Sequence, residues 1–395
     1  MDRGLECVPS MYPRQWLYLF GEEGVVYSDT RNRFAGLDAS AVAAYRAFEA
    51  GASIQDLRAF QDGRGLSSDD GLEAIYALAQ GDFPPEEARL EWPTPEHLRP
   101  DPLRATNSAS ANSGFANVEI LGVPVSVEYP AGPFEHLCRD SFRNCPPTTQ
   151  PARHCLSAQL EEGGGWTIDA NGYELLSSLQ AEQLGLGFLH AVRSLLYAEA
   201  EYDVAFHASM VADRDQGIML CAPRESGKST LAAHLVAQQF ELVTDEPALL
   251  HLDDASVFPL PMPISLKEGS WPMLQRQWPQ LAGAPVHRRS DGTRICLLHP
   301  AQARFPAPSR RLTHIVFPEY HSSSAADAER LTPLRTLSLL NEGGMILGKH
   351  LARQGFEAFL RLVCVVPAYK LRYASLYEAG ELIHKITGES AKERS

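Results

Sequence analysis

The first apolar residues of the chain are concentrated in two short runs. Trp16–Phe20 and Val25–Ser28 are separated by Gly21–Gly24, whose small and acidic residues favour a turn. Two such runs joined by a glycine-containing turn predict a β-hairpin. We expect the strand Val25–Ser28 to lie at the edge of a small sheet, where its backbone groups would be open to a further strand.

Three helices are predicted to follow this hairpin. Asp38 can cap the first, whose apolar residues recur at steps of three before Gly51. Ser53 can cap the second helix and Ser68 the third. The apolar residues expected to face the core are Val42, Tyr45, Phe48, Leu57, Phe60, Leu72, Ile75 and Leu78. The pattern therefore predicts a small α+β, winged-helix-like domain in residues 1–85.

A change in composition separates this unit from the rest of the chain. Residues 83–114 contain six prolines, followed by a run of Asn, Ser, Ala and Gly. Because repeated prolines interrupt helices and small polar residues cannot form a core, residues 86–114 are predicted to be a linker. A linker of this length would let the first domain hold a peptide while its far end reaches the second domain, residues 115–390.

The second domain begins with alternating strand and helix signals. Val118–Val127 and Cys155–Leu176 are expected to form strands, and the apolar spacing of Gln183–Ala200 predicts an amphipathic helix. No apolar run reaches the ~18 residues that span a bilayer, and Met1–Glu6 lack the apolar core of a signal peptide. We therefore expect a cytoplasmic protein without a membrane partner.

Composition narrows the function classes. The 395 residues include 35 Lys and Arg against 49 Asp and Glu, for a net charge of −14, and 44% are hydrophobic. This acidity argues against a nucleic-acid partner. The seven cysteines include no Cys-x-x-Cys pair, so a structural zinc site of the usual spacing is not predicted.

The most informative segment begins at Gly217. A short apolar strand, Gly217–Cys221, is followed by a loop and then by apolar residues at helical spacing. A strand, a tight loop ending in Gly-Lys-Ser and a helix form the context of a phosphate-binding loop. The nucleotide-binding residues predicted here are Ala222, Pro223, Arg224, Glu225, Ser226, Gly227, Lys228, Ser229 and Thr230.

Within this loop, Lys228 would reach the β- and γ-phosphates of ATP, and the Ser229 hydroxyl would bind Mg²⁺. One residue departs from the usual pattern, because Ala222 stands where the motif has its first glycine. If that position requires a positive φ, alanine there costs roughly 1 kcal/mol.

Two acidic residues follow the next predicted strand. Phe240–Thr244 leads directly to Asp245 and Glu246, and a right-handed crossover would make this strand parallel to the one before the loop. The carboxylates would then emerge beside the loop, where open α/β sheets bind ligands. We expect Asp245 to be the general base, with Glu246, Ser229 and Asp245 as metal ligands.

A histidine upstream of the loop belongs to the same group of candidate site residues. His207, the loop at 222–230 and the acidic pair at 245–246 occur in this order and at close spacing. This arrangement resembles the kinase domain of HPr kinase/phosphorylase and its relatives, over roughly residues 115–385. The resemblance implies a P-loop α/β fold, ATP and Mg²⁺ as cofactors, phosphoryl transfer to a serine hydroxyl and a homo-oligomer. His207 would orient the carboxylate of Asp245 or shift its pKa.

Downstream residues add to the same resemblance. Pro263–Ser270 is similar to a Leu-Lys segment of the related kinases and contains Lys267. Arg288, Arg289 and Arg294 supply local positive charge that would neutralise a transferring phosphoryl group. Lys267 and Arg294 are therefore included among the expected nucleotide-binding residues.

The N-terminal unit suggests the acceptor. Residues 12–82, with the transition Phe34–Ser40, resemble the PqqD-like domains, which bind leader segments of ribosomally made peptides as an added strand. Together the two resemblances imply a kinase that phosphorylates a precursor peptide. A kinase acting on a small molecule or sugar, a non-catalytic nucleotide sensor or scaffold, a nucleotide hydrolase without an acceptor, and a dimerisation role for the first domain remain alternatives.

Overall fold

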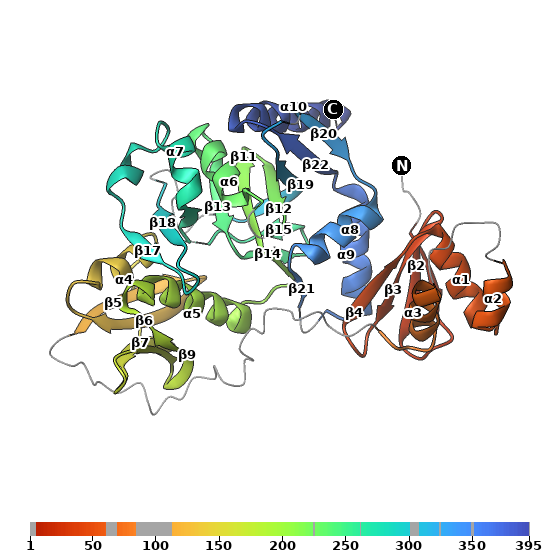
Figure 1. Cartoon of the computed structure of the whole chain (residues 1–395), viewed down its shortest axis with the longest axis horizontal. Coiled ribbons are helices and arrows are strands. Elements are labelled where there is room, and N and C mark those ends of the chain that lie inside the picture. Colours follow the sequence, from red (N-terminus) through yellow and green to blue (C-terminus); the bar gives the residue numbers. More distant parts are fainter. Residues whose placement is uncertain are drawn as a thin grey trace.

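The computed structural model describes residues 5–60, 69–83, 113–223, 226–260, 262–300, 308–323, 325–348 and 351–394. The protein is a mixed α/β structure with several separate sheets (Figure 1). The expected cap Ser68, the loop residues Arg224 and Glu225, and most of the predicted linker lie outside these ranges. Ser113 and Gly114, expected to end that linker, already belong to the strand β5.

The N-terminal unit is a sheet of antiparallel strands with helices on one face. Its elements are β1 (Glu6–Pro9), β2 (Gln15–Phe20), β3 (Glu23–Ser28), β4 (Arg33–Leu37), α1 (Ala39–Glu49), α2 (Ile54–Phe60) and α3 (Asp69–Ala79). The predicted hairpin is confirmed as β2 and β3. The Asp38 cap is also confirmed, because its carboxylate accepts the backbone N–H of Ala41 at 2.8 Å.

The expectation that Val25–Ser28 forms a sheet edge is wrong. The strand order is β1-β2-β3-β4, so β3 is paired on both sides. The sequence pattern revealed only the two strongest apolar runs, whereas β1 contains Pro9 and β4 contains Gly36, which weaken a strand signal. Within the described residues, the open edges belong to β1 and β4.

The N-terminal sheet is buried on both faces. Leu17, Leu19 and Val26 pack with α1 and α3, whereas Tyr18 and Tyr27 belong to a core shared with the C-terminal part of the chain. The Tyr27 ring stacks on Phe356 with centroids 4.0 Å apart, and its hydroxyl donates to the Leu351 carbonyl at 3.1 Å. The N-terminal unit is therefore packed against the rest of the protein, and removing it would expose Phe356.

The largest sheet carries the candidate site. Its strands run in the order β13-β11-β12-β19-β15-β14-β10-β21, and β22 pairs with β19 and β20. Their bounds are β10 (Val204–Phe206), β11 (Ala208–Asp213), β12 (Gln216–Cys221), β13 (Glu241–Asp245), β14 (Ala248–His251), β15 (Ser256–Val257), β19 (Arg310–Tyr320), β20 (Asp327–Arg330), β21 (Met345–Leu347) and β22 (Ala368–Tyr373).

Helices cover both faces of this sheet. The bounds are α6 (Lys228–Ala237), α8 (Pro333–Glu342), α9 (Arg353–Val365) and α10 (Leu376–Arg394). Because side chains alternate along a strand, Ile218 and Leu220 of β12 pack with α6 and α10. Met219 and Cys221 face the opposite core, which includes α8, α9 and the N-terminal sheet. Figure 1 shows these two helix layers on either side of the strands.

Two smaller sheets lie beside the large one. The first contains β5 (Ser113–Ile120), β6 (Val123–Pro130), β7 (His154–Leu160), β8 (Trp166–Ala170) and β9 (Tyr173–Leu179), with α4 (Glu135–Ser141) and α5 (Leu184–Glu199) against it. The second contains β16 (Ile264–Lys267), β17 (Val286–Arg288) and β18 (Arg294–Leu298), with α7 (Trp271–Leu274) nearby. The predicted amphipathic helix is thus confirmed as α5, which packs its apolar side into the first of these sheets.

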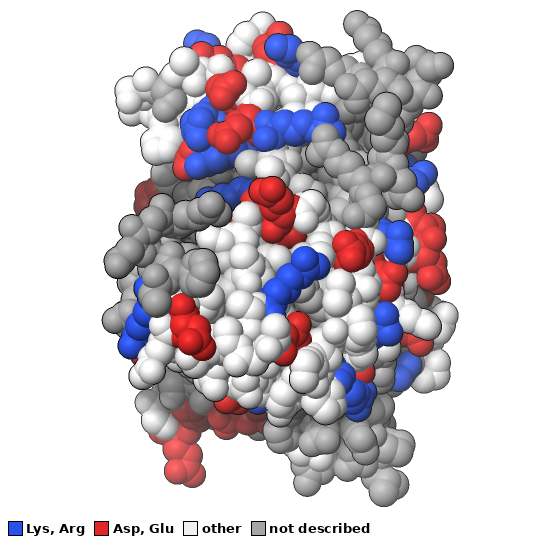
Figure 2. All heavy atoms as spheres, turned by 90° about the vertical axis from the view of Figure 1, so that its right-hand side faces the viewer, with Lys and Arg blue, Asp and Glu red and all other residues white. Residues whose placement is uncertain are grey.

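The strand directions place the predicted site residues at one edge of the large sheet. β11 lies between β12 and β13 and is antiparallel to both, so β12 and β13 run in the same direction, as predicted, without being neighbours. Their C-terminal ends therefore meet at the same sheet edge. Among the described residues, no helix has the length and apolarity needed to cross a membrane. On the face presented by the N-terminal unit, acidic and basic side chains are interspersed around a wide uncharged area (Figure 2).

Candidate functional site

The loop between β12 and α6 begins and ends as the sequence predicts. Gly227 is the N-cap residue of α6 and has a φ of +91°, a left-handed conformation that favours glycine. A Cβ at this position would lie 3.3 Å from the Tyr373 hydroxyl, so the close approach of β22 also favours glycine. Ala222 does not have a positive φ, and the expected cost of alanine at the first motif position therefore does not arise.

The Lys228 ammonium is held over this loop. Its Nζ donates to the carbonyl oxygens of Ala222 at 2.6 Å and Pro223 at 3.1 Å. Burial lowers the pKa of Lys228, although the carboxylates of Glu246 and Asp245 act in the opposite direction. The first turn of α6 therefore presents a cation and the free N–H groups of a helix start to the same space.

The Asp245 carboxylate, at the end of β13, is fixed by hydrogen bonds from three residues. It accepts the Ser209 hydroxyl at 2.5 Å, the Ser229 hydroxyl at 3.1 Å and the backbone N–H of Ser265 at 3.0 Å. Its residue is only 2% exposed. Burial raises the pKa of Asp245, while the bonds from Ser209 and Ser265 favour the ionised form. Two of the three expected metal ligands, Ser229 and Asp245, are thus in direct contact.

The Glu246 carboxylate has a different environment. It lies 2.7 Å from His207 Nδ1 and 3.7 Å from the Arg193 guanidinium, and 26% of its side chain is exposed. Burial alone would raise its pKa, but Arg193, His207 and Lys228 together lower the pKa of Glu246 to about 2. The histidine that was expected to orient Asp245 therefore contacts Glu246 instead.

The backbone at Glu246 is also unusual. Its φ is +60°, which is uncommon for a residue with a side chain and costs of order 1–3 kcal/mol. In this conformation the carboxylate contacts His207 and Arg193. Two adjacent residues in the chain consequently present their carboxylates to different partners.

These groups line a cavity of about 510 Å³, large enough for a small-molecule ligand. Its walls come from α5, from the start of α6, from β16 and the residues after it, and from the junction of β22 with α10. The predicted residues that line it are Ser226, Gly227, Lys228, Ser229, Thr230, His207, Glu246 and Lys267. Three other predicted residues do not line the cavity but contact residues that do. Lys228 donates to the carbonyl oxygens of Ala222 and Pro223, and Ser229 donates to Asp245.

The predicted basic residues separate into two groups. Lys267 and Arg289 line the cavity. Arg294 does not line it, because its guanidinium pairs with Glu268 and lies over the Trp271 ring at 5.4 Å from the centroid. Arg294 is therefore a poor candidate for direct contact with a phosphate bound beside Lys228.

Sequence reasoning missed several residues that the fold brings to this site. Arg193 reaches Glu246 from α5, and Ser209 reaches Asp245 from β11. Arg193 was detectable, because it is an isolated arginine within an otherwise apolar helical pattern. Ser209 lies two positions after His207 on an apolar strand, and nothing in the pattern distinguishes it from a core serine.

The donor set fits a magnesium ion bound together with a nucleotide. Among the described residues, no group of three or more His, Cys, Asp or Glu side chains is arranged to hold a metal ion. Mg²⁺ usually keeps several waters and binds through one or two carboxylates plus substrate phosphates. The contact between Ser229 and the buried Asp245 provides such a limited set. Comparisons with known protein families and with curated protein sequences find no match for this chain.

Proposed function

We propose that this protein is an ATP- and Mg²⁺-dependent kinase with an HPr-kinase-like P-loop domain, which transfers the γ-phosphoryl group to a serine hydroxyl of a precursor peptide. The main support is that Lys228, Ser229 and Glu246 line one cavity, with Asp245 bonded to Ser229 behind it. A loop, cation and carboxylate in this arrangement suit phosphoryl transfer, which depends mainly on positioning and charge neutralisation.

In the proposed reaction, the acceptor oxygen forms a bond to the γ-phosphorus while the bond to the β–γ bridging oxygen breaks. ADP leaves, and the hydroxyl proton passes to a carboxylate of the protein. Bound Mg²⁺ would neutralise charge on the phosphates. Lys228 binds the β- and γ-phosphates, and the helix start at Ser229 donates N–H groups to them.

We assign the proton acceptor to Glu246 and keep Asp245 as a metal ligand, whereas the sequence prediction made Asp245 the general base and counted Glu246 among the metal ligands. Asp245 is enclosed and already accepts from Ser209, Ser229 and Ser265, so an acceptor hydroxyl cannot reach it without displacing one of them. Glu246 faces the cavity and is held there by His207. Its low pKa keeps it ionised, and a carboxylate that orients the hydroxyl suffices for a loose transition state.

The direct test uses ATP labelled at the γ-phosphate, Mg²⁺ and candidate precursor peptides, followed by mass spectrometry of the peptides. We expect a serine that gains one phosphate, and no transfer by Lys228→Met. ATP consumption without a phosphopeptide would instead indicate a hydrolase, and label in a small hydroxyl compound would indicate a small-molecule kinase. ATP that binds but remains intact with every acceptor would refute a transferase.

The peptide acceptor is proposed from the PqqD-like resemblance of residues 12–82 and from the open edges of their sheet. Side chains project from the faces of a sheet, so the 2.9 Å between a Cβ at Gly36 and Leu334 Cδ1 places α8 on a face of β4 and not along its backbone edge. Within the described residues β1 and β4 both have an open edge, and we place the leader beside β1.

Cys7→Pro tests this docking without removing the unit. The Ser10 N–H donates to the Gln15 carbonyl, so in the antiparallel register the N–H groups of Ser10 and Val8 face β2 and that of Cys7 faces the open edge. Proline at residue 7 deletes this outward N–H, so the KM for a full-length precursor should rise while that for a short acceptor peptide stays the same. Cys7→Ser, which keeps the N–H, serves as the matched control. Unchanged KM values for the full-length precursor would exclude docking at this edge.

A further inference from the structure

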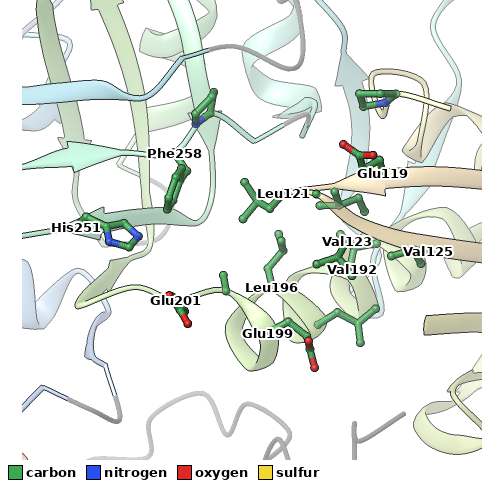
Figure 3. A pocket seen from close by; sticks show the side chains of 16 residues that line it. Glu119, Leu121, Val123, Val125, Val192, Leu196, Glu199, Glu201, His251 and Phe258 are labelled. Carbon is green, nitrogen blue, oxygen red and sulfur yellow. The ribbon is translucent and has the colours of Figure 1, made fainter. Parts of the chain in front are cut away.

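A second cavity, of about 390 Å³, lies on the other side of α5 from the candidate site. Pro146 and three segments line it: the β5–β6 hairpin, the C-terminal half of α5 with the residues just after it, and the residues around β14 and β15. Figure 3 shows Leu121, Phe258 and Leu196 reaching from these segments toward one space. Its size is within the range of about 300–1,000 Å³ typical of small-molecule sites.

The walls of this cavity are mainly apolar and its edge is acidic. The apolar lining residues are Ile120, Leu121, Val123, Val125, Val192, Leu195, Leu196 and Phe258. Glu119, Glu199 and Glu201 stand at its edge (Figure 3). Glu199 is already paired with Arg153 at 2.6 Å, whereas Glu119 and Glu201 form no ion pair within the described part of the chain.

Two further features make this edge attractive to a cation. The cavity lies at the C-terminal end of α5, where the helix dipole is negative, and the last turn of α5 has no basic residue. On the opposite wall, His251 Nε2 is buried and has no hydrogen-bond partner among the described residues. A neutral imidazole nitrogen there can accept a hydrogen bond from a bound N–H group.

We propose that this cavity binds a small organic cation, with an apolar body against the leucine and valine side chains and one ammonium group toward Glu201 and the C-terminal end of α5. Charge complementarity selects this chemistry. An anion would meet the carboxylates and the negative helix end, and a neutral apolar molecule would leave those charges without a partner. The proposal concerns binding alone and does not depend on the kinase activity.

The test compares n-hexylammonium, hexanol and hexanoate by isothermal titration calorimetry on the full chain. We expect n-hexylammonium to bind best and hexanoate not to bind. Glu201→Gln should weaken n-hexylammonium by roughly threefold to fivefold, the effect of one charge at an exposed edge. Glu182→Gln, which alters an exposed glutamate outside this cavity, should leave the affinity unchanged.

A second experiment fills the cavity with a larger side chain. Leu196→Trp from the helix and Val123→Trp from the hairpin should each abolish binding, and circular dichroism identifies which variant retains its fold. Binding that survives in a folded tryptophan variant would overturn the proposal. Equal affinity for hexanol and n-hexylammonium would likewise refute the role of the carboxylates.

Discussion

The packing of the N-terminal unit on α9 can be tested at one aromatic pair. Tyr27 and Phe356 stack at 4.0 Å with an interplanar angle of 9°, and both are fully buried. Such a pair contributes about 0.5–1.5 kcal/mol beyond the area it buries. The Tyr27 hydroxyl adds a bond to the Leu351 carbonyl, for which the net contribution is about 0.5–1.5 kcal/mol.

A double-mutant cycle with Tyr27→Leu and Phe356→Leu measures the stacking directly. We expect a coupling free energy of about 1 kcal/mol, and an additional loss of about 1 kcal/mol in Tyr27→Phe from the missing hydroxyl bond. Urea unfolding followed by circular dichroism gives these values. Tyr12→Phe is the matched control, since Tyr12 lies in the N-terminal unit and its side chain is exposed.

Two outcomes would contradict the packing of the N-terminal unit on α9. Additive effects of Tyr27→Leu and Phe356→Leu would mean that the rings do not interact in solution. A first unfolding transition that shifts with Tyr27→Leu while a second stays fixed would mean that the N-terminal unit unfolds independently.

Three further predictions concern the candidate site, the last of them in comparison with the cap of α1. Lys228→Met should reduce kcat by 10²-fold or more, measured with labelled ATP, whereas Lys370→Met, which alters only an ion pair with Glu319, should have little effect. At increasing Mg²⁺, Asp245→Asn should regain part of its kcat and Glu246→Gln should not; the opposite pattern would return the proton acceptor to Asp245. The stability measured by thermal unfolding should also depend on pH in opposite ways at two aspartates, Asp245 and Asp38. Burial raises the pKa of Asp245 above its unfolded value, so the native carboxyl binds its proton more tightly and the wild type should lose stability relative to Asp245→Asn as pH rises from about 4. The N-cap bonds of Asp38 lower its pKa, so the wild type should gain stability relative to Asp38→Asn as pH rises toward 4; equal slopes for the two variants would contradict both assignments.

The local part of the candidate site could be predicted from sequence because it is continuous in the chain. A buried strand, a loop ending in Gly227 and a helix starting at Lys228 follow one another, and handedness then brings the next strand's acidic end to the same edge. The partners of those carboxylates could not be predicted in this way. Whether His207 contacts Asp245 or Glu246 depends on the local backbone at Glu246, which has a positive φ.

The position of the N-terminal unit had a signal that the hairpin prediction did not use. The run Trp16–Phe20 is apolar at every position, whereas a sheet with one face in solvent alternates apolar and polar residues. Leu17 and Tyr18 point to opposite faces of the strand, so each must be buried in a different core. The pattern indicates that both faces are covered, but it cannot identify α9 as the covering element, because many apolar helix faces would serve.

Helix α5 lies between the two cavities and lines both of them. Val192 lines the apolar cavity and the next residue, Arg193, lines the cavity with the loop and the carboxylates. Successive residues of an α-helix project about 100° apart, so these side chains point to two different sides of the same rigid helix. A small rotation of α5 about its axis that narrows the apolar cavity would also move the Arg193 guanidinium relative to Glu246. The shape of the apolar cavity and the position of the Arg193 guanidinium beside Glu246 are therefore coupled through α5.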